Sequence, residues 1–291
     1  MLLNVTKIIQ YKQTLTLKLK VQLKPFNKFK KKELEILNNK IFKFYSGGIY
    51  IPYNKITNHK KGLWKIIYKE LREQLLTSKK KIKILEIGAA KTGFAHFLKE
   101  KKIYKHIDFY CFDITKNNQK WYQRINCKKS FYKDLDLINH KFDIVFSSYV
   151  LEHVVYMEKF LNKNINLLTE NGKLYINCPR YDLPLYLNPG CRHINFLSKI
   201  KIALIQIFYR TITLIFKKNY FLITNDLSIF HKPYFSDADS MNWVSKFEIS
   251  NFFDNKKFKT NFMQAKSYGK VLSKDWFIKK FCTILLVASK N

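Results

Sequence analysis

Apolar and polar side chains alternate in the N-terminal part of the chain before a helical pattern replaces the alternation. In residues 14–24, TLTLKLKVQLK, every second residue is a leucine or valine, so the apolar side chains share one face, which predicts a strand. Pro25 ends this pattern, and residues 31–44 predict a short helix. We therefore expect residues 1–60 to form an N-terminal accessory segment, to which the sequence assigns no chemistry.

From residue 63 onward the pattern is that of an α/β domain. Residues 63–76 carry apolar side chains at helical spacing, and apolar strands then alternate with helical stretches. This alternation implies a parallel sheet with helices on both faces. The predicted strands are residues 81–88, 106–114, 142–148, 172–179, 258–265 and 282–289, and the predicted helices between them are 94–102, 154–168 and 246–253. We expect a Rossmann-like, doubly wound α/β domain over residues 61–291.

The loop after the first of these strands carries the first candidate chemistry. In residues 84–94, ILEIGAAKTGF, an apolar strand with Glu86 near its end leads into a tight turn that contains Gly88, and a helix follows. Doubly wound sheets bind their ligands at the carboxyl ends of the strands, next to this turn. Gly88 would let the backbone approach a ligand closely. By itself, the pattern also fits a plain β–α turn.

A second acidic residue, Asp113, ends the next predicted strand, twenty residues beyond Gly93. A carboxylate at this position accepts hydrogen bonds from ribose hydroxyls in Rossmann-type sites. NAD enzymes share this feature, but their phosphate loop requires G-x-G-x-x-G, whereas residues 88–93 read GAAKTG. Glu86 also suits a cationic amino-acid cofactor better than a pyrophosphate.

Together with residues 141–154, KFDIVFSSYVLEHV, and 167–180, LLTENGKLYINCPR, these motifs resemble the class I S-adenosylmethionine-dependent methyltransferases. They are most similar to the small-molecule and glycan-type group of that family. The resemblance covers residues 80–180 well and the last helix and strand loosely. It implies S-adenosylmethionine as cofactor and a mostly parallel, seven-stranded sheet. It also leaves residues 198–235 as a helical insertion after strand five.

The resemblance also assigns residues to the cofactor. The residues expected to contact it are Glu86, Gly88, Ala90, Gly93, Asp113, Asp134 and Ser147. Glu86 and Gly88 are expected to line the methionine end, and Asp113 to hold the ribose. Asp134 is expected on the adenine side, and Ser147 where the fourth strand opens onto the cofactor.

The cofactor loop departs from the family pattern at two positions. Ala90 and Thr92 replace the second and third family glycines, and Gly93 comes one place late. We therefore expect this loop to hold the cofactor differently or more weakly than in other members.

Methyl transfer from a sulfonium is an in-line displacement, in which positioning of the acceptor supplies much of the rate. A hydroxyl acceptor also benefits from a base, and histidine is the natural candidate. His193 follows strand five, and His231 lies in a polar, aromatic cluster with Asp237 and Asp239. Both histidines are candidates for a catalytic or substrate-binding role, with a solvated loop as the alternative for His231. We expect a structural role for His153, and no spacing predicts a metal site.

The net charge of +33 is spread through every part of the chain. Lys is over-used together with Asn, Ile, Phe and Tyr, as an AT-rich genome would produce without an anionic partner. The charge and the similarity of residues 86–94 to the first loop of the ribosomal RNA 2′-O-methyltransferases leave an RNA methyltransferase as an alternative. That family, however, has an aspartate at the tip of strand four, where this chain has Ser147 and Ser148. A non-catalytic scaffold with the same fold is a third alternative.

The five cysteines are scattered without a C-x-x-C pair, which favours a reducing compartment. The first residues contain no apolar run long enough for a signal peptide, so the cytoplasm is the expected location. The function we expect is methylation of a sugar hydroxyl in a cell-surface glycan or a lipid-linked small molecule.

Residues 198–218 exceed what the family core needs. On a helix, Lys199, Gln206, Arg210, Thr213 and Lys217 form one narrow polar stripe on an otherwise apolar rod. The apolar run that Arg210 interrupts is too short to span a bilayer. Two alternatives remain: the helix packs as a lid or dimer interface, or it lies in the inner membrane surface with its basic residues at anionic headgroups.

Overall fold

The computed structural model describes residues 23–47, 62–77, 80–184, 186–191, 194–225, 239–263, 273, 277 and 280–290. Within these residues the predicted α/β fold is confirmed, with a seven-stranded sheet in the order β4-β3-β2-β5-β6-β9-β8. The strands are β2 (Ile82–Ile87), β3 (Ile107–Asp113), β4 (Lys129–Tyr132), β5 (Phe142–Ser148), β6 (Leu168–Pro179), β8 (Phe258–Phe262) and β9 (Thr283–Lys290). Neighbouring strands from β4 to β6 are parallel, and β9 runs antiparallel to both β6 and β8.

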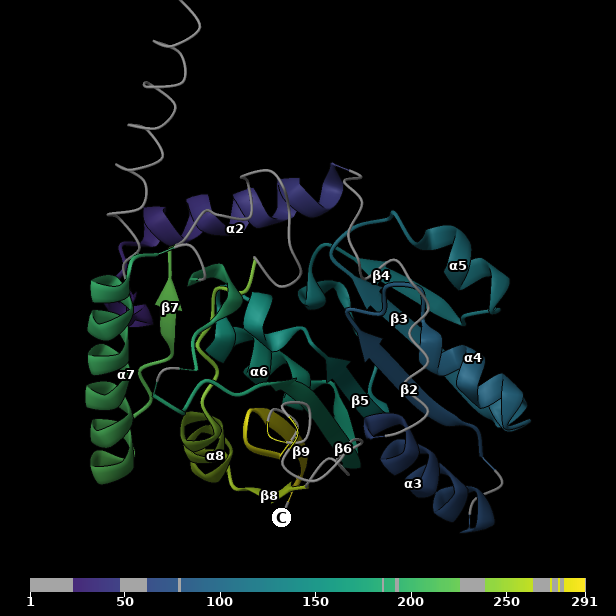
Figure 1. Ribbon diagram of the computed structural model, residues 1–291. Helices are drawn as coiled ribbons and strands as arrows, with labels where there is room; N and C mark the ends of the chain where they lie inside the picture. The colour runs from purple at the N-terminus through teal and green to yellow at the C-terminus, as the bar shows by residue number, and fades with distance from the viewer. Residues whose placement is uncertain are drawn as a thin grey trace, which may run out of the picture.

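Helices cover both faces of this sheet (Figure 1). They are α3 (Leu63–Thr77), α4 (Gly93–Glu100) and α5 (Gln119–Arg124) on one face, and α6 (Met157–Asn166) and α8 (Lys246–Asn255) on the other. Successive strand residues feed the two cores in turn: Ile84 packs with the first group of helices and Leu85 with the second. This period of two across a sheet buried on both faces explains why the strands read as almost unbroken apolar runs.

The N-terminal segment packs onto the sheet domain through α2 (Lys31–Ser46), which confirms the helix predicted for residues 31–44. The buried face of α2, with Leu34 and Ile41, contacts Val155, Ile223 and Met241. Most of the strand predicted for residues 14–24 lies outside the described residues. Its last two residues belong to β1 (Leu23–Pro25), which pairs antiparallel with β7 (Leu222–Thr224).

The long helix α7 (Phe196–Phe216) follows β6 at the place where the insertion is predicted. It stands at the outer edge of the molecule beside β7 and α8 (Figure 1). Short 3-10 helices connect other elements; they are η1 (Phe26–Lys28), η3 (Tyr104–His106), η4 (Leu135–Leu137), η5 (Leu151–His153) and η6 (Pro189–Cys191).

Candidate functional site

A cavity of about 940 Å³ lies at the carboxyl ends of the parallel strands. Its walls are the loop from β2 to α4 and the segments that follow β3, β4 and β5. The N-terminal helix α2 contributes Asn38, Ile41 and Tyr45 to a further wall. The side chain of Asn117, beyond β3, donates a hydrogen bond to the carbonyl of Tyr45 at 2.8 Å. The accessory segment is therefore part of the cavity, which the sequence did not indicate.

The β2–α4 loop turns sharply under the cavity. Gly88 has φ +69°, and the amides of Gly88 and Ala89 both donate to the carbonyl of Phe112. A Cβ at Gly88 would lie 2.4 Å from Cγ2 of Val150. Glycine is therefore required by its backbone conformation and by Val150, and not by a ligand alone as the sequence suggested.

Ala90 and Thr92, which stand where the resemblance expects glycines, adopt a backbone conformation that favours glycine. Their φ angles are 44° and 51°, in the left-handed region that residues with a Cβ seldom adopt. Thr92 is fully buried, and its hydroxyl has no hydrogen-bond partner among the described residues. Gly93 begins α4 and lines the cavity. The loop thus holds the glycine-type turn with strained residues.

Glu86 faces the cavity from the end of β2. Its side chain is buried, and Oε2 has no hydrogen-bond partner in the described part of the chain. Burial raises the pKa of Glu86 well above its usual value, and the nearby Cys127 and Asp113 raise it further. A positively charged ligand in the cavity would relieve this unpaired carboxylate.

Asp113, at the tip of β3, is held by four donors. Its carboxylate accepts hydrogen bonds from the amides of Ile114 (2.7 Å) and Ala90 (3.2 Å), the Tyr122 hydroxyl (3.0 Å) and the Asn118 amide (3.4 Å). Burial raises the pKa of Asp113, although these hydrogen bonds oppose the change. The bond from Ala90 ties the carboxylate to the strained loop.

Of the two remaining predicted cofactor residues, one lines the cavity and the other does not. Asp134 follows β4, lines the cavity and accepts a hydrogen bond from the amide of Asp136. Ser147 is 1 % exposed and is not part of the cavity wall, whereas the next residue, Ser148, is. Because successive strand residues point to opposite faces, the serine at the cavity is one place later than expected.

His153, in η5, lines the same cavity beside Tyr45. Its Nδ1 lies 3.0 Å from Oδ2 of the buried Asp239, and the Tyr45 hydroxyl donates to that same oxygen. Burial tends to raise the pKa of Asp239, but the charge of His153 and hydrogen bonds from His153 and Tyr45 outweigh it and lower the pKa. Asp239 therefore stays ionised and orients the imidazole.

The two histidines proposed as bases, His193 and His231, lie outside the described residues, as does Asp237. Of the predicted polar cluster, the structure describes Asp239, which meets His153. Within the described ranges, no group of three or more His, Cys, Asp or Glu residues is placed to hold a metal ion.

Residues 62–259 match the model of a family described as a methyltransferase domain. The chain belongs to this family. This match confirms the resemblance of the methyltransferase's motifs to the class I enzymes. No curated protein matches its sequence.

The chain is also similar to solved structures. The plantazolicin methyltransferase BpumL, in complex with a pentazolic desmethylPZN analog and SAH, has a TM-score of 0.50 at 10 % identity, over 89 % of this chain and 98 % of that one. Magnesium protoporphyrin IX methyltransferase (ChlM) from Synechocystis PCC 6803, with bound SAH, has a TM-score of 0.43 at 12 % identity, over 87 % and 94 %. At 10 % identity, the likeness to BpumL concerns the fold alone.

Proposed function

We propose that this chain uses S-adenosylmethionine to methylate a hydroxyl group, and that the hydroxyl belongs to a sugar of a cell-surface glycan or of a lipid-linked small molecule. A cavity of about 940 Å³ lies near the upper end of the range of small-molecule sites, which suits a cofactor beside an acceptor. The small-molecule or glycan acceptor rests on the group that the motifs resemble.

The residues of the cavity fit the cofactor. S-adenosylmethionine supplies an electrophilic methyl group on a positively charged sulfur, next to an ammonium group. Glu86 offers an unpaired, buried carboxylate oxygen to such a cation, and Asp113 holds a carboxylate at the ribose position. Asp134 lies beyond β4, where the adenine end is expected.

The pair of His153 and Asp239 is the observation that supports an oxygen acceptor. Nδ1 lies 3.0 Å from Oδ2 of Asp239 and Nε2 lies 3.8 Å from Oε1 of the buried Glu152, so a proton taken up by His153 would have a carboxylate beside either nitrogen. S-adenosylmethionine would supply the methyl group, which leaves its sulfur for the acceptor oxygen; His153 would accept the proton that the hydroxyl gives up, and the carboxylate would stabilise the resulting imidazolium. Activity should therefore rise with pH as His153 loses its proton and then level off.

The first test is cofactor binding. Titration calorimetry should detect S-adenosylmethionine on the wild type and a much weaker signal on Asp113→Ala. Removal of a hydrogen-bonded charged group corresponds to a loss of about tenfold to a hundredfold in affinity. Equally undetectable heat for both proteins would contradict the proposal and favour a non-catalytic scaffold.

The second test addresses the base, with nucleotide sugars and polyprenyl-phosphate-linked sugars as acceptors and mass spectrometry as readout. His153→Asn should lower kcat by about a hundredfold or more without changing cofactor affinity. Asp239→Asn should also lower kcat and move the rising limb of the pH profile to lower pH, because the imidazolium loses its counter-charge.

Tyr45→Phe is the matched control, since it removes the other donor to Asp239 and leaves His153 in place. Its kcat should fall by less than about tenfold. Unchanged kcat and pH profile in His153→Asn would reject this base. Methylation of carbon or nitrogen in place of oxygen would reject the acceptor class.

A further inference from the structure

Helix α7 has its polar side chains toward the protein and its apolar side chains toward solvent. Its polar residues Gln206, Arg210 and Thr213 are buried against the protein, while large apolar side chains face solvent. The polar stripe expected from the sequence therefore exists, but its central residues point inward. Arg210 therefore cannot contact a lipid headgroup, although the sequence suggested that the basic residues of this stripe would do so.

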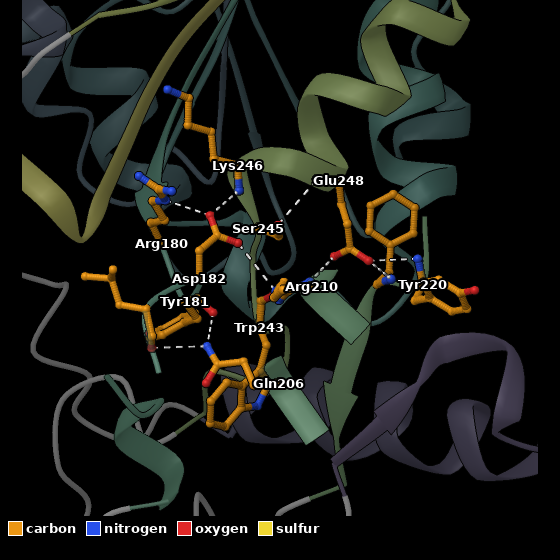
Figure 2. Close-up of polar contacts among 12 residues, drawn as sticks. Arg180, Tyr181, Asp182, Gln206, Arg210, Tyr220, Trp243, Ser245, Lys246 and Glu248 are labelled. Atoms are coloured by element: carbon orange, nitrogen blue, oxygen red, sulfur yellow. Dashed lines mark hydrogen bonds and ion pairs between the residues drawn. The ribbon is translucent and has the colours of Figure 1, made fainter. Parts of the chain in front are cut away.

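A buried ion network fixes this orientation (Figure 2). The Arg210 guanidinium lies 2.6 Å from Oε2 of Glu248 on α8 and 3.4 Å from Oδ1 of Asp182, and it donates to the carbonyl of Trp243. Asp182 is also paired with Arg180 at 2.6 Å. Rotating α7 would separate these buried charges, so the helix is held with its apolar face outward.

The outward face is broad and continuous. Eight large apolar side chains of α7 are between 44 % and 75 % exposed: Phe196, Leu197, Leu204, Ile207, Phe208, Leu214, Ile215 and Phe216. They recur at helical spacing along a rod of about 30 Å. None of them lines the cavity, so α7 is not a lid over the site.

The exposed charges on α7 itself have one sign. The sequence has no Asp or Glu between Asp182 and Asp226. Lys201, Lys217 and Lys218 are exposed on α7 and just beyond its end. A helix whose apolar face is flanked by lysines and that carries no acidic residue of its own matches the surface of an anionic bilayer, where acyl chains lie next to phosphate groups.

We propose that α7 docks flat onto an anionic membrane surface, with Leu204 and Phe208 among the inserted side chains and the lysines at lipid phosphates. The alternative, in which α7 forms a dimer interface with a second copy of the chain, fits this charge pattern less well. In a two-fold contact the same face meets itself, so the lysines of one copy would find no acidic partner on the other. In the described part of the chain, no helix is long and apolar enough to cross a membrane.

Flotation with vesicles of phosphatidylcholine and phosphatidylglycerol tests this proposal on the full chain at low salt, and it requires no methyl transfer. The wild type should float with these vesicles and not with pure phosphatidylcholine. Leu204→Glu/Phe208→Glu should lower the partition coefficient by tenfold or more. Lys201→Gln/Lys217→Gln/Lys218→Gln should lower it by about fivefold for each lysine.

Ile36→Glu/Leu76→Glu is the matched control, because it adds the same charge at exposed apolar side chains on α2 and α3. It should float like the wild type. Wild-type protein that stays unbound with anionic vesicles would overturn the proposal. So would a wild-type dimer in sedimentation equilibrium that Leu204→Glu/Phe208→Glu dissociates without any vesicle binding. Because the lysine variant leaves the apolar face intact, it decides the matter even if the glutamate variant misfolds.

Discussion

The inner side of α7 and the cavity both bury charged groups, but they treat them in opposite ways. Behind α7, Arg210 is paired with Glu248 and Asp182. In the cavity, the carboxylates of Glu86 and Asp113 have no ion-pair partner among the described residues, and burial raises the pKa of both. Behind α7 the charges neutralise one another within the protein. In the cavity, Asp113 is stabilised by hydrogen bonds alone, and Oε2 of Glu86 has no partner among the described residues until a ligand binds.

This difference separates a buried charge that fixes the fold from one that serves binding. Where a buried charge is paired, removal of one partner lowers the stability of the protein. An unpaired buried carboxylate lowers stability as long as the site is empty, and neutralising it should raise stability and lower affinity. We therefore expect that removing a charge behind α7 lowers the free energy of unfolding, whereas neutralising the carboxylate of Glu86 in the cavity raises it.

The largest effect is expected for Arg210→Leu. It leaves Glu248 buried without its cation, while Asp182 keeps Arg180, and the free energy of unfolding should fall by about 3 to 5 kcal/mol. Urea denaturation of the cofactor-free protein measures this loss. Arg210→Leu/Glu248→Gln should recover part of it, since no unpaired charge is left.

Lys201→Gln, on the exposed face of the same helix, is the control and should stay within about 0.5 kcal/mol of wild type. A loss below about 1 kcal/mol for Arg210→Leu would mean that the network does not hold α7.

The next effect has the opposite sign. Glu86→Gln should raise the free energy of unfolding of the cofactor-free protein by about 1 to 3 kcal/mol near neutral pH and weaken S-adenosylmethionine binding about tenfold or more. The pKa of Glu86 is raised in the folded state, so the folded state holds the proton more tightly than the unfolded state. The wild type therefore loses stability as pH rises from the ordinary glutamate pKa to the raised one.

The gain in Glu86→Gln should accordingly vanish at acidic pH, where the carboxyl is protonated in both states. Glu70→Gln is the control, because Glu70 is paired with Lys173 at 2.7 Å and should lose a little stability in place of a gain. Destabilisation by Glu86→Gln at neutral pH would show that this carboxylate has a structural role.

Most of the fold could be predicted because β2, β3, β5 and β6 are buried on both faces and read as apolar runs. The edge strand β4 (Lys129–Tyr132) was not assigned, since Phe131 is its one buried side chain. Glu86 and Asp113 were found because each stands at or next to the end of an apolar strand.

Contacts between distant segments could not be predicted. Asp239 reaches His153 because the amides of Met241 and Asn242 donate to the carbonyl of Glu152, which brings two remote segments together. Helical spacing likewise predicted the polar stripe of α7 but not the side on which it faces the protein. The charged partners of Arg210 lie on other elements, and only the fold shows where they are.

The smallest effect concerns strain in the cavity loop. Thr92 adopts φ 51° at the start of α4, whereas Lys217 adopts φ 50° at the C-cap of α7, where this conformation is ordinary. Glycine at either position removes about 1 to 2 kcal/mol of strain but adds unfolded-state entropy, so Thr92→Gly and Lys217→Gly should each gain about 0.5 to 1 kcal/mol in urea denaturation. If the strained turn shapes the site, calorimetry should show weaker S-adenosylmethionine binding for Thr92→Gly alone. A stability loss in Thr92→Gly would mean that packing of the buried threonine outweighs its strain.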